Sequence, residues 1–209
     1  MIAVKRFKSK TVATAAAPLA GGRHSVRIIG GAWRGRRVEF PDAPGLRPTP
    51  DRVRETVFNW LQGPILGARC LDLFAGSGAL GLEALSRGAS AVVFVERSPH
   101  VARSLRSQLA RLGAESRARV IEMGVARDLR TPGESFDVVF ADPPFGEDAL
   151  GETTAALAAG TWLNPGSHIY LESERSAGVP VLPASWTLLK SKTAGEVGYH
   201  LASAGAPVS

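Results

Sequence analysis

Cysteine and histidine are scarce in this sequence: Cys70 stands alone, and only four histidines occur among the 209 residues. A single cysteine forms no disulfide within the chain, which favours a reducing compartment, so a cytoplasmic protein is expected. The histidines lack the spacing typical of metal ligands, and no metal site is predicted. No apolar run approaches the roughly 20 residues that cross a bilayer, which argues against a membrane protein. Cys70 itself lies in an apolar stretch and is predicted to be part of the core rather than a nucleophile.

The N-terminal segment loosely mimics an export signal. Residues 1–10 are basic and residues 11–20 are rich in alanine, but this apolar part has a single leucine and is interrupted by Pro18. Those features are too weak for the hydrophobic region of a signal peptide. We therefore expect residues 1–23 to be a flexible extension.

Charge is distributed unevenly along the chain. The formal net charge is +6, yet residues 1–54 contain 12 basic and 3 acidic residues, a net charge of +9, and the remainder has a net charge of −3. A basic N-terminal arm before a mildly acidic body predicts a polyanionic partner, with nucleic acid favoured over an anionic membrane surface. A merely solubilising function of these charges stays open at this point.

A small appendage is predicted ahead of the main domain. Over residues 25–40, two short β-prone runs flank glycines at positions 30, 31 and 35, which indicates a β-hairpin. A proline-rich loop follows over residues 41–50. Asp51 is expected to cap a helix that Gly63-Pro64 ends, with an apolar face formed by Val53, Val57, Trp60 and Leu61. We assign residues 24–50 to a basic hairpin and loop, and residues 51–209 to the main domain.

Strands and helices alternate through the rest of the chain. Predicted strands cover residues 69–74, 91–96, 119–123, 136–141 and 168–172, and predicted helices cover residues 79–86, 99–112 and 147–159. Pro99 in the first turn and Gly113 past the end mark the longest helix. Two final strands, over residues 186–192 and 197–202, are predicted to form a terminal hairpin. This pattern predicts an α/β fold with a doubly wound, mostly parallel, seven-stranded sheet.

The first predicted strand of this sheet leads into the glycine-rich run L-D-L-F-A-G-S-G-A-L-G. Gly76, Gly78 and Gly81 have the spacing G-x-G-x-x-G, and Glu96 ends the next strand 20 residues after Gly76. Such glycines let a ligand approach the backbone at a helix N-terminus, and the acid can accept hydrogen bonds from ribose hydroxyls. The run therefore predicts a nucleoside site; the alternative is a tight strand–helix turn with a solvent-facing Glu96.

Asp72 bears on which nucleoside cofactor binds here. Its carboxylate lies four residues before Gly76, where it would repel the pyrophosphate of a dinucleotide but pair with the ammonium group of S-adenosyl-L-methionine. The position therefore favours S-adenosyl-L-methionine over a nicotinamide cofactor. A hydrogen-bonded structural carboxylate is the alternative interpretation of Asp72.

The fourth predicted strand ends in the tetrapeptide Asp142-Pro143-Pro144-Phe145. The carboxyl ends of the strands line the ligand crevice of an open α/β sheet. Two prolines stiffen the loop and remove two N–H donors, so that Asp142 and a backbone carbonyl can accept hydrogen bonds from an –NH₂ group while Phe145 offers a flat face to a base. An exocyclic amine is a poor nucleophile because its lone pair is delocalised. Orienting that lone pair toward a methyl donor is the chemistry that these residues predict.

Four segments together carry a resemblance to a known family. The run D-P-P-F is similar to the (D/N/S)-P-P-(Y/F) motif of amino-group methyltransferases. Together with R-I-I-G-G-A-W-R-G-R-R, L-R-P-T-P-D-R-V-R-E-T-V-F-N-W-L and L-D-L-F-A-G-S-G-A-L-G-L-E-A-L-S-R-G, it resembles the bacterial small-subunit rRNA guanine-N2 methyltransferases over about residues 26–203. The resemblance implies a class I, Rossmann-like methyltransferase fold with S-adenosyl-L-methionine as cofactor. It also implies a monomer that acts on small-subunit (16S) rRNA in an assembled or assembling 30S particle.

The resemblance further implies which residues form the sites. It assigns catalysis to Asp142, Pro143, Pro144 and Phe145. It places Thr49 over the methionine end of the cofactor and Glu96 at the ribose. The implied cofactor-binding set is Thr49, Asp72, Phe74, Ala75, Gly76, Ser77, Gly78, Glu96 and Arg97.

Guanidinium groups and an indole alternate in the basic arm of residues 24–50. The predicted RNA-binding set, suited to phosphate contacts and to stacking on an unpaired base, is Arg27, Trp33, Arg34, Arg36 and Arg37. The alternative is a solvated hairpin with Trp33 packed on the main domain. Other activities also stay open: methylation of DNA adenine or protein glutamine, a nicotinamide-dependent oxidoreductase, or a non-catalytic RNA-binding module.

Overall fold

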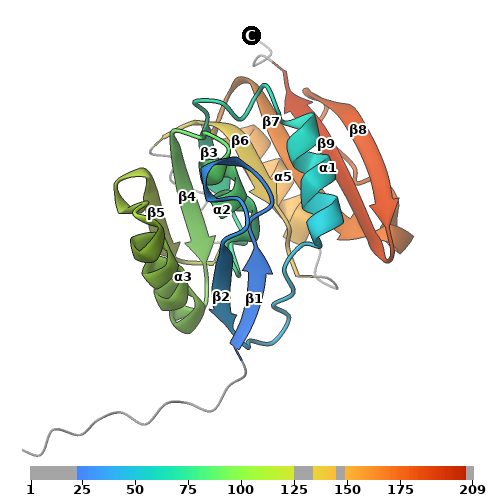
Figure 1. The fold of residues 1–209 in the computed structure, drawn as a ribbon. Helices are drawn as coiled ribbons and strands as arrows, with labels where there is room; N and C mark the ends of the chain where they lie inside the picture. The colour runs from blue at the N-terminus through green and yellow to red at the C-terminus, as the bar shows by residue number, and fades with distance from the viewer. Residues whose placement is uncertain (1–22, 125–133, 145–148, 206–209) are drawn as a thin grey trace, which may run out of the picture.

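The computed structural model describes residues 23–124, 134–144 and 149–205, which fold around a seven-stranded sheet with the order β5-β4-β3-β6-β7-β9-β8 (Figure 1). The strands β5, β4, β3, β6 and β7 pair in parallel in this order, whereas β9 is antiparallel to both of its neighbours, β7 and β8. The predicted doubly wound, mostly parallel sheet is therefore confirmed. The strands are β3 (Arg69–Asp72), β4 (Ala91–Glu96), β5 (Ala118–Glu122), β6 (Phe136–Ala141), β7 (Leu163–Glu174), β8 (Trp186–Ala194) and β9 (Val197–Ala204).

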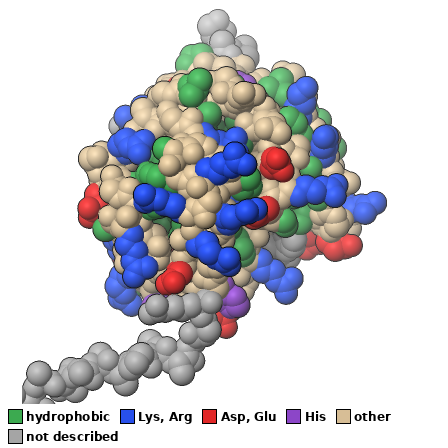
Figure 2. Space-filling view, in the orientation of Figure 1, with side chains coloured by type: hydrophobic (Ala, Val, Ile, Leu, Met, Phe, Trp, Pro, Cys, Tyr) green, Lys and Arg blue, Asp and Glu red, His purple; other side chains and the backbone are tan. Residues whose placement is uncertain are grey.

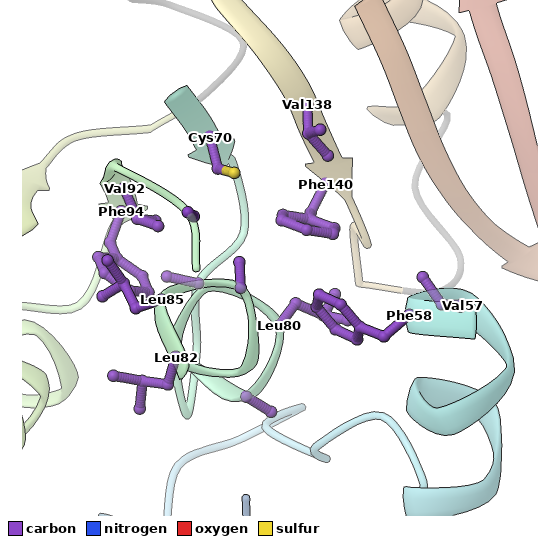
Figure 3. Packing of buried hydrophobic residues seen from close by; sticks show 14 of the residues in the cluster. Val57, Phe58, Cys70, Leu80, Leu82, Leu85, Val92, Phe94, Val138 and Phe140 are labelled. Carbon is purple, nitrogen blue, oxygen red and sulfur yellow. The ribbon is translucent and has the colours of Figure 1, made fainter. Parts of the chain in front are cut away.

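Helices cover both faces of the sheet. On one face, Phe58, Leu80 and Phe140 come from two helices and a strand and point toward one another within one apolar core (Figure 3). On the other face, Leu157 belongs to a second apolar core. Cover on both faces explains why the inner strands are continuous apolar runs. Among the described residues, the helices of the first face are α1 (Asp51–Trp60), α2 (Ala79–Ser86) and α3 (Pro99–Leu112), and that of the second is α5 (Ala149–Ala159).

The bounds of α3 agree with the sequence prediction. Pro99 lies in its first turn, the hydroxyl of Ser98 accepts a hydrogen bond from the N–H of Val101, and Gly113 takes a left-handed conformation (φ 67°) just past the end. Helix α2 and strands β4 and β6 also have their predicted bounds. The predicted helix over 147–159 begins, within the described residues, at Ala149.

The start of α1 corrects one expectation. Asp51 is the first residue of the helix, and Pro50 occupies the N-cap position without a side-chain hydrogen bond. The carboxylate of Asp51 instead accepts a hydrogen bond from Nη2 of Arg54 at 2.5 Å. The expected cap was wrong because the neighbouring guanidinium, rather than the free backbone N–H groups, binds the carboxylate.

The apolar face of α1 is broader than the sequence predicts. Three of the four expected residues are buried: Val53, Val57 and Leu61. Trp60 is only half-buried, and its ring stacks on that of Tyr199 with centroids 5.5 Å apart. Phe58, which was not expected on this face, is fully buried against Phe140 at 5.8 Å. Helix α1 therefore contacts both β6 and β9.

Some strand ends differ from the prediction. Strand β7 extends over residues 163–174 rather than 168–172, with an irregular register against β6 between Phe136 and Val138. Strand β3 ends at Asp72 rather than at Phe74, because the chain turns there into the glycine-rich run. Beyond Asp72, the N–H of Leu73 still bonds the carbonyl of Phe140 in β6, and the N–H of Ala75 bonds the carbonyl of Val95 in β4.

The predicted N-terminal hairpin is present as an antiparallel pair, β1 (Arg23–Arg27) and β2 (Arg37–Pro41). A short 3-10 turn, Gly31–Trp33, lies in the connection. Because β1 begins at Arg23, the hairpin takes the last residue of the expected 1–23 extension. The rest of that extension lies outside the described residues.

The hairpin docks on α2 through the buried carboxylate of Glu83. Its two oxygens accept hydrogen bonds from the N–H groups of Ile29 and Gly30, each at 2.8 Å. Gly31 (φ 74°) passes so close to α2 that an added Cβ would lie 1.8 Å from the carbonyl oxygen of Ser86. A buried carboxylate is stable only when its oxygens are bonded, so these contacts fix the hairpin to the main domain.

Candidate active site

The glycine-rich run forms a tight loop between β3 and α2. Gly76 and Gly78 have positive φ angles of 50° and 77°, and Gly78 is the N-cap of α2. An added Cβ on Gly78 would lie 2.5 Å from Cδ1 of Leu105 in α3, and one on Gly81 would lie 2.2 Å from the ring of Phe94 in β4. Glycine is therefore required at Gly76 and Gly78 for the backbone conformation, and at Gly78 and Gly81 for close packing. Because the loop follows β3 directly, its backbone lies at the carboxyl edge of the sheet.

Asp72 lies at the end of β3 and is almost fully buried. Its Oδ2 accepts a hydrogen bond from the N–H of Gly81 at 3.0 Å. Burial raises the pKa of Asp72 from 3.8 to about 7, although the bond from Gly81 opposes the shift. Asp72 is thus a hydrogen-bonded structural carboxyl, the alternative interpretation in the sequence analysis. That it also contacts the ammonium group of the methionine moiety stays a prediction.

Glu96 joins the glycine loop to the next strand. Its Oε2 accepts from the N–H of Gly76 at 2.9 Å, and its Oε1 accepts from the N–H of Ser98 at 2.7 Å. The side chain is buried rather than solvent-facing, which excludes that alternative. Each carboxylate oxygen can accept more than one hydrogen bond, so a ribose hydroxyl can still bind here.

The other expected cofactor residues surround this loop. Ala75 and Ser77 are buried, and Phe74 is partly buried. Arg97 is exposed directly after Glu96. The segment before α1 also reaches the loop, because Cδ1 of Leu46 lies 3.1 Å from where a Cβ on Gly76 would be.

Asp142 follows β6, the strand that pairs with β3 in the middle of the sheet. Its Oδ2 accepts a hydrogen bond from the hydroxyl of Thr49 at 3.4 Å. Burial raises the pKa of the Asp142 carboxyl well above its ordinary value, and the charges of Glu172 and Asp72 raise it further, while the bond from Thr49 lowers it. Asp142 and Thr49, 93 residues apart in the sequence, therefore meet at the carboxyl edge of the sheet.

The rest of the expected catalytic tetrapeptide is described in part. Pro143 is buried and Pro144 is partly buried. Phe145 lies outside the described residues. The two prolines contribute no N–H donors to this turn, as expected for a turn that accepts hydrogen bonds.

Glu172 is a buried acid that the sequence analysis did not single out. It lies on β7 with 3% of its surface exposed, and its Oε1 accepts a hydrogen bond from the hydroxyl of Tyr170 at 2.6 Å. In the parallel pairing of β6 with β7, Ala141 is opposite Leu171, so the next residues, Asp142 and Glu172, are adjacent. Burial raises the pKa of Glu172, opposed by hydrogen bonds from Tyr170 and Thr49. The signal for it was an acidic residue at the carboxyl end of the strand beside the catalytic one.

The arginines of the arm are exposed, and the tryptophan is not. Figure 2 shows Lys and Arg side chains spread over the face that carries the hairpin. Four of the expected RNA-binding residues are exposed: Arg27, Arg34, Arg36 and Arg37. Two of them also have partners within the domain: Arg37 donates to the hydroxyl of Ser25, and Arg27 lies 3.6 Å from the carboxylate of Asp51.

Trp33 corrects the expectation of a stacking platform. Only 8% of its surface is exposed, and it belongs to the core on the α2 face. The backbone N–H of Trp33 donates to the hydroxyl of Ser86 at 2.9 Å, and the guanidinium of Arg117 lies 5.6 Å from the centroid of the indole ring. The indole is thus packed on the main domain, as in the alternative interpretation, and in this conformation it offers no free face to a base.

Other predictions from the sequence concern the core and its surroundings. Cys70 is buried in β3, and burial raises the pKa of its thiol, which confirms a core position. Within residues 23–124, 134–144 and 149–205, no group of three or more His, Cys, Asp and Glu side chains is arranged to hold a metal ion. None of the described helices has the length and apolar character needed to cross a membrane.

Comparison with known proteins agrees with this geometry. A family model described as Conserved hypothetical protein 95 matches residues 26–203. Ribosomal RNA small subunit methyltransferase D of Escherichia coli strain K12 is 49% identical over 184 residues, which cover 88% of this chain and 92% of that protein. The protein of the same name from Haemophilus influenzae is 46% identical, over 84% of this chain and 92% of its own length.

Solved structures show the same similarity. The methyltransferase yhhF from Escherichia coli superposes with a TM-score of 0.82 at 46% identity, covering 87% of this chain and 99% of that one. A 16S rRNA N2 methyltransferase from Thermus thermophilus, solved in complex with AdoMet and guanosine, has a TM-score of 0.64 at 25% identity. That match covers 90% of this chain and 52% of the Thermus chain.

Proposed function

The chain belongs to the same family as ribosomal RNA small subunit methyltransferase D, and from this premise we propose that it transfers a methyl group from S-adenosyl-L-methionine to the exocyclic N2 amine of a guanine in small-subunit rRNA. The observation that carries the proposal is the position of Asp142 at the end of β6, beside β3, whose end begins the glycine loop. An amine held by Asp142 would therefore face a methyl donor held by the loop.

The residues around the glycine loop fit S-adenosyl-L-methionine better than a dinucleotide. Two carboxyls, Asp72 and Glu96, flank the loop and bond its N–H groups. Their charge suits a ligand with an ammonium and a sulfonium and opposes a pyrophosphate. S-adenosyl-L-methionine supplies an electrophilic methyl group. In the proposal, Glu96 bonds the ribose and Asp72 faces the methionine ammonium.

The remaining expected residues complete the proposed cofactor site. The loop residues Phe74, Ala75, Gly76, Ser77 and Gly78 line its backbone side, and Arg97 lies at its rim. Leu46 already contacts the loop, which supports a position of the segment before α1 over the cofactor. Thr49, in the same segment, bonds Asp142 at 3.4 Å, so this segment also reaches the proposed amine site.

The turn after β6 has the groups that an exocyclic amine needs. The N2 lone pair of guanine is delocalised into the ring, so the amine reacts when its hydrogens are held by acceptors and its lone pair is directed at the methyl group. Asp142 supplies a carboxyl acceptor, and Pro143 and Pro144 keep the turn stiff and free of competing N–H donors. Phe145, outside the described residues, is the proposed flat surface for the base.

The exposed arginines of the hairpin favour a nucleic acid as the substrate. Arg27, Arg34, Arg36 and Arg37 are exposed residues of the hairpin, as expected for contacts with phosphates. A protein glutamine would leave this surface without an evident purpose. DNA phosphates would fit it as well as RNA phosphates do, and the similarity to rRNA methyltransferases is what favours RNA over DNA. We further propose that the substrate is rRNA within an assembled or assembling 30S particle, which places the enzyme in the cytoplasm, and that the enzyme is a monomer that needs no metal.

Mapping of the methylated nucleotide tests the proposal. The enzyme is incubated with tritiated S-adenosyl-L-methionine and small ribosomal subunits that lack the modification, and the labelled nucleotide is identified after digestion. Label on N2 of a single guanine in wild type, and none with Asp142→Ala, is the expected result. Label in protein or DNA, or on a ring nitrogen, would contradict it.

A further inference from the structure

The hydroxyl of Thr49 lies between two carboxyls, those of the partly buried Asp142 and the buried Glu172. This hydroxyl is 3.4 Å from Oδ2 of Asp142, and it is close enough to Glu172 to lower the pKa of that carboxyl as a hydrogen-bond donor. Glu172 receives a second donor on its other side, the hydroxyl of Tyr170 at 2.6 Å. Nε of Arg54 donates to the carbonyl of Thr49 at 3.0 Å, which fixes the backbone of this residue. Asp142, Thr49 and Glu172 thus form a continuous chain of hydrogen-bonding groups.

The hydrogens in this chain limit its protonation. A threonine hydroxyl has one hydrogen, so it cannot donate to two ionised carboxylates at once. If one acid is protonated, it donates to the threonine oxygen while the threonine donates to the other acid. Glu172 also has the bond from Tyr170, so it is better suited to be the anion, with the proton on Oδ2 of Asp142. In this protonation state the bond between Asp142 and Thr49 runs from the carboxyl to the threonine oxygen, the reverse of its sense when Asp142 is ionised.

The guanidinium of Arg54 binds the carbonyl of Thr49, but its ion pairs are with Asp51 and Glu83. Among the described residues neither Asp142 nor Glu172 forms an ion pair. The titratable groups that face them are acidic or phenolic, and they come from each neighbouring strand: Asp72 on β3, Tyr170 on β7 and Tyr199 on β9. Two adjacent carboxyls without an ion-pair partner hold a proton more readily than either would alone.

We propose that Glu172 is a positioning residue that acts on Asp142 through Thr49 and receives the proton released during methyl transfer. This rests on the proposed function. As nitrogen N2 bonds the methyl carbon, the carbon–sulfur bond breaks and its electron pair stays on sulfur. The N–H proton then passes to Oδ1 of Asp142. The proton on Oδ2 of Asp142 passes to Oγ1 of Thr49, and the hydroxyl proton of Thr49 passes to Glu172. Charge and atoms balance: the sulfonium loses its positive charge and the Glu172 carboxylate is neutralised.

Titration of the ligand-free protein tests the coupling without any substrate. The carboxyl carbons of Asp and Glu are labelled with carbon-13, and the Asp142 resonance is assigned by its loss in Asp142→Asn. Glu172→Gln should lower the titration midpoint of Asp142 by about one pH unit or more, because a neighbouring negative charge is lost. Thr49→Val should also lower it, because the protonated Asp142 carboxyl loses the acceptor for its hydrogen. Glu174→Gln, the same change at an exposed position of β7, is the matched control and should leave it unchanged.

Single-turnover kinetics over about pH 5 to 9 test the proton path. Glu172→Gln and Thr49→Val should each slow methyl transfer roughly tenfold or more while cofactor affinity stays within a few-fold. The double variant should be no slower than either single variant, because both changes interrupt one path. Thr49→Ser keeps the hydroxyl and should keep most of the rate. In wild type the rate should rise with pH as the doubly protonated pair of Asp142 and Glu172 loses one proton and reaches the singly protonated state. Glu172→Gln should move this rise in rate to lower pH.

Two results would overturn the inference: an Asp142 midpoint that Glu172→Gln leaves unmoved, or equal loss of rate at every pH with Thr49→Ser as slow as Thr49→Val. The second result would mean that Glu172 and Thr49 only support the fold. Failure of the wild-type enzyme to methylate small subunits is a different result. It would count against the proposed function, while the substrate-free titration would still decide whether Glu172 and Asp142 are coupled.

Discussion

The guanidinium of Arg54 and the carboxylate of Glu83 are both closed off from solvent, at 1% and 0% exposure, with Nη1 and Oε2 3.3 Å apart. The pair joins α1 to α2. Glu83 also accepts the N–H groups of Ile29 and Gly30 from the hairpin, and Arg54 donates to the carbonyl of Thr49. One buried ion pair thus fixes both the basic arm and a residue that bonds Asp142.

Removal of Arg54 should destabilise the fold strongly. Arg54→Met keeps the apolar part of the side chain but leaves Glu83 buried with one cation fewer. Loss of one member of a buried ion pair costs about 3–5 kcal/mol of unfolding free energy, and the low end is expected because Arg87 still bonds Glu83. Urea unfolding followed by circular dichroism measures the change.

Arg119→Met is the matched control, because Arg119 pairs with Glu134 at the surface and its side chain is 60% exposed. Exposed pairs contribute less than about 1 kcal/mol. Equal losses for the two variants would mean that burial of the Arg54–Glu83 pair has no particular effect on stability.

Asp72 should make the stability depend on pH. Burial raises its pKa from 3.8 to about 7, so the folded state binds this proton more tightly than the unfolded state does. The resulting stabilisation is full below about pH 4 and is lost as pH rises through about 7. Asp72→Asn keeps an acceptor for the N–H of Gly81 but cannot titrate. Its unfolding free energy should therefore decline less between about pH 5 and 8, by a few kcal/mol at most.

Urea unfolding at both pH values gives the comparison, with Asp42→Asn as control because that side chain is 70% exposed. If the unfolding free energies of wild type and Asp72→Asn changed equally between these pH values, the ionisation of Asp72 would not destabilise the folded protein. In that case a cation or an unseen donor would have to lie beside it.

Local signals in the sequence were enough to predict most of the fold. Pro99 and Gly113 mark the ends of α3 through backbone geometry alone, and the alternation of apolar runs predicted a seven-stranded sheet. The glycine loop and Asp142 could be placed at one edge because parallel strands carry their ligands there. These features depend on neighbours in the sequence.

Features that depend on distant partners could not be predicted in the same way. Trp33 has the flanking arginines of a base-stacking residue, but its exposure depends on how the hairpin docks on Ser86 and Glu83, more than 50 residues away. Asp51 has the sequence of a helix cap, yet a buried guanidinium takes its carboxylate. Glu172 is one acid among several near the end of β7, and only the register with β6 puts it beside Asp142.

Asp142 should affect methyl transfer far more than cofactor binding. Asp142→Ala removes the proposed acceptor of the amine and should largely abolish single-turnover methylation, with cofactor affinity by calorimetry within a few-fold of wild type. Asp142→Asn keeps a carbonyl acceptor and should lose less. Near-wild-type single-turnover rates in Asp142→Ala would remove Asp142 from the chemical step. The same calorimetry should find S-adenosyl-L-methionine bound more tightly than NAD.

The arm should supply phosphate contacts for RNA. Replacing Arg34, Arg36 and Arg37 by Ala removes three exposed guanidinium groups and changes no residue of the glycine loop. Each lost phosphate contact flattens the slope of log affinity against log salt by roughly 0.7 to 0.9, so a change of about two to three units is expected if all three touch phosphates. Salt titration of binding to small subunits measures it, and cofactor affinity should be unchanged.

Trp33→Ala separates the arm's charge from its packing. Because the indole is buried, the variant should lose about 3–5 kcal/mol of unfolding free energy, as for other large-to-small changes in a core, and its salt slope should stay that of wild type. The triple-arginine variant should show the opposite pattern, with a changed slope and wild-type stability. If instead Trp33→Ala were as stable as wild type and bound RNA less tightly, the indole would have to leave its pocket on α2 to stack on a base. An unchanged slope in the triple variant would reduce the hairpin to a solubilising surface and reopen a protein substrate.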